Sequence, residues 1–78
     1  MRVLIVEDDA ALAGQMKQSL VDTGYSVDQA GDGEEGHFLG DTEPYDAVIL
    51  DLGLPVMDGA RVLKRWRADG KEMPVLIL

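Results

Sequence analysis

The sequence predicts an α/β fold in which helices cover a parallel sheet. Four short apolar runs alternate with three segments that carry apolar residues at helical spacing. The runs at residues 2–6 and 47–50 are almost continuously apolar, which is typical of strands buried on both faces. Strands that alternate with helices are joined by right-handed crossovers, so we expect one domain with the order βαβαβαβ.

The chain begins with a predicted strand, Arg2 to Val6, which a predicted helix follows. Asp9 is a suitable N-cap for this helix, and Gly24 is suited to its C-terminal end. Its apolar face recurs every four residues, at Leu12, Met16 and Leu20. We therefore assign Met16 to core packing and not to a metal site.

The second strand and the second helix are predicted less strongly. Apolar and polar residues alternate in Tyr25 to Ala30, as expected near the edge of a sheet. Gly36 and Gly40 weaken the helix predicted from Gly33 to Leu39, since each costs about 1 kcal/mol relative to alanine. His37 has no neighbouring His or Cys at metal-ligand spacing, so we expect a surface or packing role for it.

The remaining elements follow a loop at Asp41 to Asp46. Ala47 to Leu50 is the third strand, and Gly59 to Asp69 is the third helix, which Gly70 ends. The helix has an apolar stripe formed by Val62, Leu63 and Trp66. Pro74 to Leu78 is apolar throughout and is typical of another central strand.

Composition and charge exclude several classes of function. The net charge is −8, and residues 1–60 hold 13 of the 15 acidic but only two of the seven basic side chains. This excess of acid argues against direct nucleic-acid binding. The basic residues of 61–78 suit either an acidic partner or phosphate, or the solvated face of one helix. Because cysteine, a membrane-length apolar run and a signal-peptide pattern are all lacking, we expect a cytoplasmic protein without membrane contact.

Acidic side chains follow two of the predicted central strands. Glu7 and Asp8 come after the first strand, and Asp51 comes directly after the third. Ligands of open α/β sheets bind beyond the carboxyl ends of the strands, which favours a chemical role for Asp51. The alternative is that Asp51 caps the next turn, because Asp is common at strand ends. If the two strands are neighbours, three carboxylates meet, and their repulsion favours the uptake of either a proton or a cation.

Such a crevice suits phosphoryl chemistry. Carboxylate oxygens with open positions favour Mg²⁺, which binds through one or two carboxylates, retained waters and a substrate phosphate. An Asp side chain can itself become the nucleophile and form an aspartyl phosphate. An unrelated nucleotide or phosphate binder is disfavoured, because no Gly-rich loop follows the first strand.

The segments VLIVEDD, VILDLGLPVMDG and PVLIL together resemble the receiver domain of bacterial response regulators, and in detail the OmpR/PhoB class of transcriptional regulators. The resemblance covers residues 1–78, as the N-terminal part of such a domain. It implies an incomplete flavodoxin-like (CheY-like) fold, a doubly wound parallel sheet of strand order 2-1-3-4. It also implies a regulatory phosphoacceptor that catalyses at most its own phosphorylation and dephosphorylation.

The resemblance implies a role for each residue of the acidic site. Asp51 would accept a phosphoryl group from a sensor histidine kinase and so control a DNA-binding output module outside this segment. Asp8, Asp51 and the backbone carbonyl of Gly53 would hold Mg²⁺, and Glu7 would act on the metal through water. The residues that would shape the following loop and turn it into the third helix are Pro55, Asp58 and Gly59.

The family pattern also contains residues that this sequence lacks. Receiver domains are longer, and they place a Thr or Ser after the fourth strand and a Lys further on. We therefore expect a receiver cut after its fourth strand, with metal binding retained and phosphorylation impaired. The alternative is a metal-binding or strand-swapping association module without phosphotransfer. It predicts a homodimer, because the segment MPVLIL offers an uncharged sheet edge.

Overall fold

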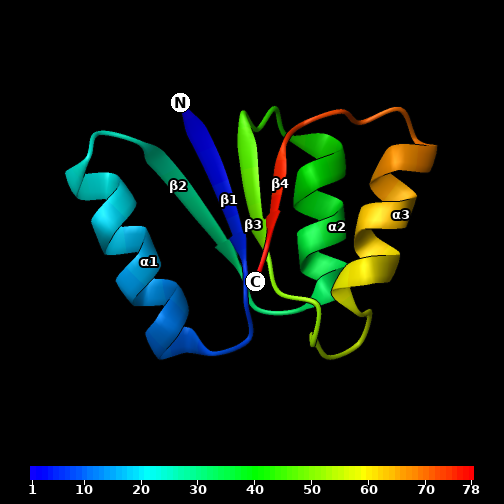
Figure 1. Cartoon of the computed structure of the whole chain (residues 1–78), viewed down its shortest axis with the longest axis horizontal. Helices are drawn as coiled ribbons and strands as arrows, with labels where there is room; N and C mark the ends of the chain where they lie inside the picture. The colour runs from blue at the N-terminus through cyan, green and yellow to red at the C-terminus, as the bar shows by residue number, and fades with distance from the viewer.

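A computed structural model describes residues 1–78 as a four-stranded parallel sheet between two layers of helices. The elements are β1 (Arg2–Val6), α1 (Ala10–Asp22), β2 (Ser26–Ala30), α2 (Gly33–Thr42), β3 (Ala47–Leu50), α3 (Gly59–Ala68) and β4 (Val75–Ile77). The strand order is β2-β1-β3-β4, with α1 on one face of the sheet and α2 and α3 on the other (Figure 1). The predicted doubly wound sheet of order 2-1-3-4 is confirmed. None of the three helices has the length and apolar character required to cross a lipid bilayer.

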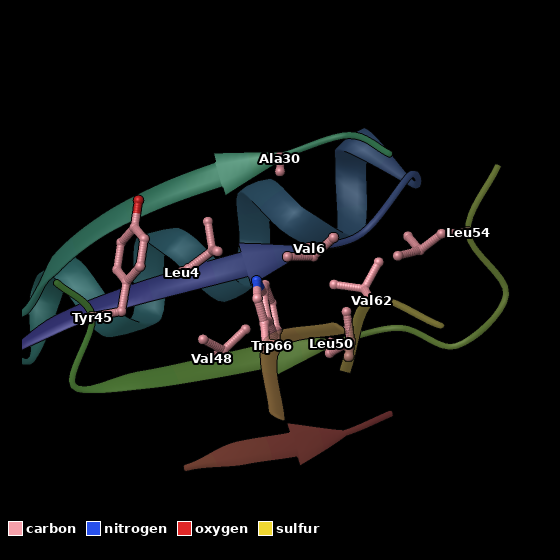
Figure 2. Close-up of a cluster of buried hydrophobic side chains, with 9 residues drawn as sticks. All are labelled: Leu4, Val6, Ala30, Tyr45, Val48, Leu50, Leu54, Val62 and Trp66. Carbon is pink, nitrogen blue, oxygen red and sulfur yellow. The ribbon is translucent and has the colours of Figure 1, made fainter. Parts of the chain in front are cut away.

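Alternate side chains of the sheet enter two separate cores. The larger core lies between the sheet and the α2–α3 layer, and Trp66 stands at its centre (Figure 2). Its buried members are Leu4, Val6, Ala30, Tyr45, Val48, Leu50, Leu54, Val62 and Trp66. The smaller core lies under α1 and contains Val3, Ile5, Ala13 and Val27. β1 is thus buried on both faces, as its sequence predicts.

The prediction of burial on both faces is wrong for β3. Val48 and Leu50 are buried in the larger core, but Ile49 on the opposite face of β3 is only partly buried. β4 is an edge strand, as the predicted order 2-1-3-4 requires, although its apolar run is typical of a central strand, and its Leu76 is 62 % exposed. The reason is that α1 packs on β1 and β2 alone, which leaves the β3–β4 half of that face uncovered.

The helices begin and end largely where the sequence predicts. Asp9 and Asp58 are N-caps, and Asp32, predicted only as part of a turn, caps α2 in the same way. Gly24 and Gly70 follow α1 and α3 with φ values of +104° and +81°, which glycine adopts without strain. Because the strands are parallel, all three helices begin at the same end of the sheet, where the carboxyl ends of β1 and β3 lie (Figure 1).

Other predictions for the helices and strands are corrected by a few residues. β2 begins one residue later than predicted, because the Tyr25 N–H donates to the Leu20 carbonyl at the end of α1 (3.1 Å). α3 ends one residue earlier, and β4 is shorter than the apolar run that predicts it. In α1, Leu12 is 39 % exposed, and the small Ala13 is the buried residue of this helix. α1 therefore packs on the sheet through fewer apolar side chains than the recurrence of Leu12, Met16 and Leu20 predicts.

The glycines of α2 allow close packing, and this helix runs to Thr42 and not only to Leu39 as predicted. A Cβ atom on Gly36 would lie 2.6 Å from Val6 Cγ1, and one on Gly40 would lie 2.6 Å from Trp66 Nε1. The Trp66 indole is fully buried beside them and donates to the His37 carbonyl at 3.2 Å. Burial of this large ring offsets the low helix propensity of the glycines. His37 itself is partly buried, and its surface or packing role stays a prediction.

Gly40→Ala should destabilise the fold by about 1 to 3 kcal/mol, because the added methyl group overlaps the Trp66 ring and overpacks the core. Urea unfolding followed by circular dichroism measures this free energy. Gly14→Ala in α1 is the matched control, since a Cβ atom there meets nothing within 4 Å. It should stabilise the fold by about 0.5 to 1 kcal/mol. An unchanged unfolding free energy in Gly40→Ala would show that α2 does not depend on this contact.

Candidate functional site

The carboxyl ends of β1 and β3 lie side by side, since these strands pair in parallel with Val6 opposite Leu50. The Asp51 N–H continues this pairing by donating to the Val6 carbonyl at 3.0 Å. The predicted adjacency of the two strands is therefore confirmed. The structure brings Glu7, Asp8 and Asp51 together, with one carboxylate oxygen from each residue within 4.8 Å of those from the other two.

The three carboxyl groups occupy different environments. Glu7 is buried at 7 % exposure, Asp51 is partly buried and Asp8 is exposed. The Glu7 carboxylate accepts the backbone N–H of Asp8 at 3.0 Å, and Asp51 Oδ1 accepts the N–H of Gly53 at 3.2 Å. Asp51 thus stabilises the turn that follows it and also lies in the carboxylate cluster. The two interpretations of Asp51 in the sequence are compatible.

Crowding of the acids displaces two pKa values in opposite directions. A hydrogen bond to Asp51 raises the pKa of Glu7 to about 7, and burial and the charge of Asp51 act in the same direction. The same hydrogen bond lowers the pKa of Asp51, helped by the N–H of Gly53. The two carboxyl groups therefore share one proton below neutral pH when no cation is bound. This agrees with the expectation that one of the crowded acids takes up a proton.

The loop after β3 is fixed at both of its ends. Asp58 caps α3 by accepting the Arg61 N–H at 3.0 Å, and the Gly59 N–H donates to the Leu52 carbonyl at 3.0 Å. A Cβ atom on Gly59 would lie 2.8 Å from Leu52 Cα, so glycine is required where α3 starts against this loop. Asp58 and Gly59 turn the chain into the third helix, as predicted.

Two residues that support the loop were not predicted from the sequence. Leu54 is buried in the larger core, although glycine and proline flank it. Gly33, the first residue of α2, donates its N–H to the Pro55 carbonyl at 3.3 Å. A Cβ atom on Gly33 would lie 2.6 Å from the carbonyl carbon of Met57. The sequence signal for Leu54 is its apolar character inside a turn-rich loop, whereas Gly33 has no signal beyond being a glycine near a helix start.

The donor set fits a hard divalent cation. All three side chains offer carboxylate oxygens, which Mg²⁺ and Ca²⁺ prefer, and no His or Cys takes part. A cation among these oxygens would reduce the repulsion between the carboxylates, as the proton on Glu7 does in the metal-free chain. Ligation by the Gly53 carbonyl stays a prediction. The structure fixes the position of Gly53 through its N–H bond to Asp51.

Comparison with known proteins decides the family. Residues 3–78 match the family model described as response regulator receiver domain. The chain belongs to this receiver family. It is 47 % identical over 78 residues to the transcriptional regulatory protein QseB of Escherichia coli O157:H7, covering 100 % of this chain and 36 % of that protein. The chain thus spans about a third of the length of this OmpR/PhoB-type relative.

Solved receiver structures share the fold. The receiver domain of the Francisella response regulator 1452 superposes with a TM-score of 0.94 at 34 % identity, covering 97 % of this chain and 63 % of that one. The response regulator TrrA of Thermotoga maritima, solved in complex with Mg²⁺–BeF, superposes with a TM-score of 0.91 at 32 % identity, covering 97 % and 66 %. The predicted CheY-like arrangement of this receiver chain is therefore shown.

Proposed function

We propose that this chain is the N-terminal part of a phosphoacceptor receiver domain in which Asp51 takes a phosphoryl group from a sensor histidine kinase. The observation that carries the proposal is the convergence of Glu7, Asp8 and Asp51 at the carboxyl ends of two neighbouring strands. In a receiver-family chain, this convergence gives Asp51 both a nucleophilic oxygen and acidic neighbours suited to a cation. The transcriptional role of its relatives favours control of a DNA-binding module elsewhere in the whole protein.

In the proposed reaction, a carboxylate oxygen of Asp51 attacks the phosphorus atom of the donor. A phosphorus–oxygen bond forms as the bond between phosphorus and the histidine nitrogen of the kinase breaks, and the leaving imidazole takes up a proton. The lowered pKa of Asp51 keeps this carboxylate ionised and available at neutral pH. The Gly53 N–H fixes the orientation of this carboxylate by donating a hydrogen bond to its Oδ1 atom.

We assign the cation site to Asp8, Asp51 and the backbone carbonyl of Gly53, with Glu7 acting through water. When bound there, Mg²⁺ supplies the positive charge that offsets the charge of the transferring phosphoryl group. The relative TrrA, solved with Mg²⁺–BeF, supports this choice of cation. A cation bound there would favour the ionised form of Glu7.

Phosphorylation by a small donor tests the proposal. The chain, incubated with acetyl phosphate and Mg²⁺, should gain one phosphoryl group in its intact mass, more slowly than a complete receiver domain because the Thr or Ser and the Lys of the family pattern are lacking. Reduction of the acyl phosphate followed by peptide mapping should locate the group at Asp51. Omission of Mg²⁺ should suppress the gain. A chain that binds Mg²⁺ but gains no phosphoryl group would support the alternative of a metal-binding module without phosphotransfer.

A second candidate function is association of two copies through the outer edge of β4. The Pro74 carbonyl and the Leu78 N–H bond to β3 at 2.9 and 3.0 Å, so by alternation the backbone groups of Val75 and Ile77 point outward. No charged side chain interrupts residues 74–78, which leaves this edge open to pairing. The adjoining uncovered sheet face holds an apolar groove of about 310 Å³, lined partly by Val3, Ile49 and Leu76.

Sedimentation velocity tests this second candidate. The 78-residue chain should dimerise at high micromolar concentration, and Leu76→Lys should make it monomeric, because a charge at a strand edge opposes pairing. Phe38→Lys on α2 is the matched control, since Phe38 and Leu76 are both 62 % exposed and only Leu76 lies on the edge strand. A monomeric parent chain at these concentrations would contradict the candidate.

A further inference from the structure

The loop after Asp51 contains a strained residue that the proposed reaction does not use directly. Val56 has a φ of +69° and is the only residue other than glycine with a positive φ. This conformation is unfavourable for a β-branched side chain, and Val56 is 75 % exposed, so burial does not compensate for it. Across it, the Met57 N–H donates to the Pro55 carbonyl at 2.8 Å, which closes a three-residue γ-turn of the rare, positive-φ kind.

The surroundings of the turn hold this strain in place. The Pro55 carbonyl accepts a second hydrogen bond, from the Gly33 N–H at the start of α2. Gly33 is buried, and a Cβ atom there would lie 2.6 Å from the Met57 carbonyl carbon. On the near side of the turn, Leu54 is anchored in the larger core. The loop is therefore pulled against α2 at its tip and held to the core beside Asp51.

We infer that Val56 is a positioning residue for the acidic site. The strained turn shortens the path of the loop between Asp51 and α3, and thereby keeps Gly53 within hydrogen-bonding distance of Asp51 Oδ1 (3.2 Å). A relaxed turn at Val56 would lengthen the loop and release Gly53 from Asp51. The inference rests on the proposed function, because Gly53 and Asp51 are residues assigned there to the cation site.

Substitutions at Val56 with opposite backbone preferences test the inference. Val56→Pro cannot adopt a positive φ, so hydrogen exchange of the Gly53 amide in the metal-free chain should accelerate, and Mg²⁺ affinity measured by calorimetry should fall by about 10-fold or more. Val56→Asn tolerates a positive φ and should keep both values while raising the urea midpoint. Unchanged Gly53 exchange and Mg²⁺ affinity in folded Val56→Pro would overturn the inference.

Gly33→Ala displaces the same loop from the opposite side, and it serves if Val56→Pro does not fold. Its added methyl group meets the Met57 carbonyl, so Gly53 exchange should again accelerate and Mg²⁺ affinity fall. Gly31→Ala is the matched control, because a Cβ atom there has nothing within 4 Å. If neither displacing variant changes Gly53 exchange, Val56 does not position the site.

The two readouts separate this inference from the proposed function. Hydrogen exchange of Gly53 is measured without metal, and it decides the role of Val56 in holding the loop. Absence of Mg²⁺ binding by the unmodified chain would overturn the proposed function alone. Mg²⁺ binding by the unmodified chain, together with equal binding and equal Gly53 exchange in all variants, would overturn the inference alone.

Discussion

Asp51→Asn should reduce phosphoryl uptake from acetyl phosphate to below detection. The asparagine amide is a poor nucleophile at phosphorus. The substitution also removes the one carboxylate that β3 contributes to the cluster. Mg²⁺ affinity should fall by about 10-fold or more, since one charged oxygen ligand is lost. Intact-mass spectrometry and calorimetry measure the two effects on the same preparation.

Asp41→Asn is the control for this substitution, because it makes the same chemical change near the C-terminal end of α2, at the opposite end of the helix from the site. It should keep both phosphoryl uptake and Mg²⁺ affinity. A phosphoryl group found on Asp51→Asn at the level of the unmodified chain would place the phosphoacceptor at another residue. Phosphoryl loss in both variants would show that the assay follows the fold and not the site.

Mg²⁺ affinity should rise with pH up to about pH 7 and level off above it. The pKa of Glu7 is raised to about 7 by its hydrogen bond with Asp51 and by burial, so below that pH a proton must leave before the cation binds. Each pH unit below 7 should therefore weaken binding by about tenfold. Calorimetry in buffers of different ionisation enthalpy counts the proton released. It should approach one per Mg²⁺ at pH 6 and fall toward none at pH 9.

The same proton affects stability in the absence of metal. The folded pKa of Glu7, about 7, lies above its ordinary value of 4.5, so the stability that the proton contributes is complete below pH 4.5 and is lost as pH rises through 7. The unfolding free energy should fall by about 1 to 3 kcal/mol over this range. Asp51 has the opposite sign, because its lowered pKa adds stability that is lost only in acid.

Glu7→Gln should remove most of both pH dependences, since glutamine cannot release the proton. Glu34→Gln, on the exposed side of α2, is the matched control and should leave them unchanged. A Glu7→Gln chain whose Mg²⁺ affinity still rises tenfold per pH unit would assign the titrating proton to another group.

Local patterns were sufficient to predict the strands, their order of succession and the acids at their ends. A parallel sheet places all carboxyl ends of its strands together, so Glu7 and Asp51 could be predicted to lie at the same end of the sheet. That they meet depends on the pairing of β1 with β3, which the family resemblance implied and the residue pattern alone left open. The partial burial of β3 could not be predicted in this way. It depends on which helices cover each face, and α1 covers only β1 and β2.

The errors in α2 and in the loop have a similar origin. Gly36 and Gly40 have low helix propensity. Because they lack a Cβ atom, however, they let Val6 and Trp66, which are distant in the sequence, pack directly against α2. The positive φ of Val56 is imposed by loop closure against Gly33 and has no local signal, because valine itself disfavours it. Tertiary neighbours, and not local preference, determine both features.

The common starting edge of the three helices has an electrical consequence. Peptide dipoles add along each helix, so α1, α2 and α3 each bring a partial positive charge, about half an elementary charge, to the edge that holds the acids. The N-cap carboxylates of Asp9, Asp32 and Asp58 offset part of this field. The net charge of −8 repels an approaching anion. The helix dipoles weaken this repulsion at the end of the molecule where Asp51 lies.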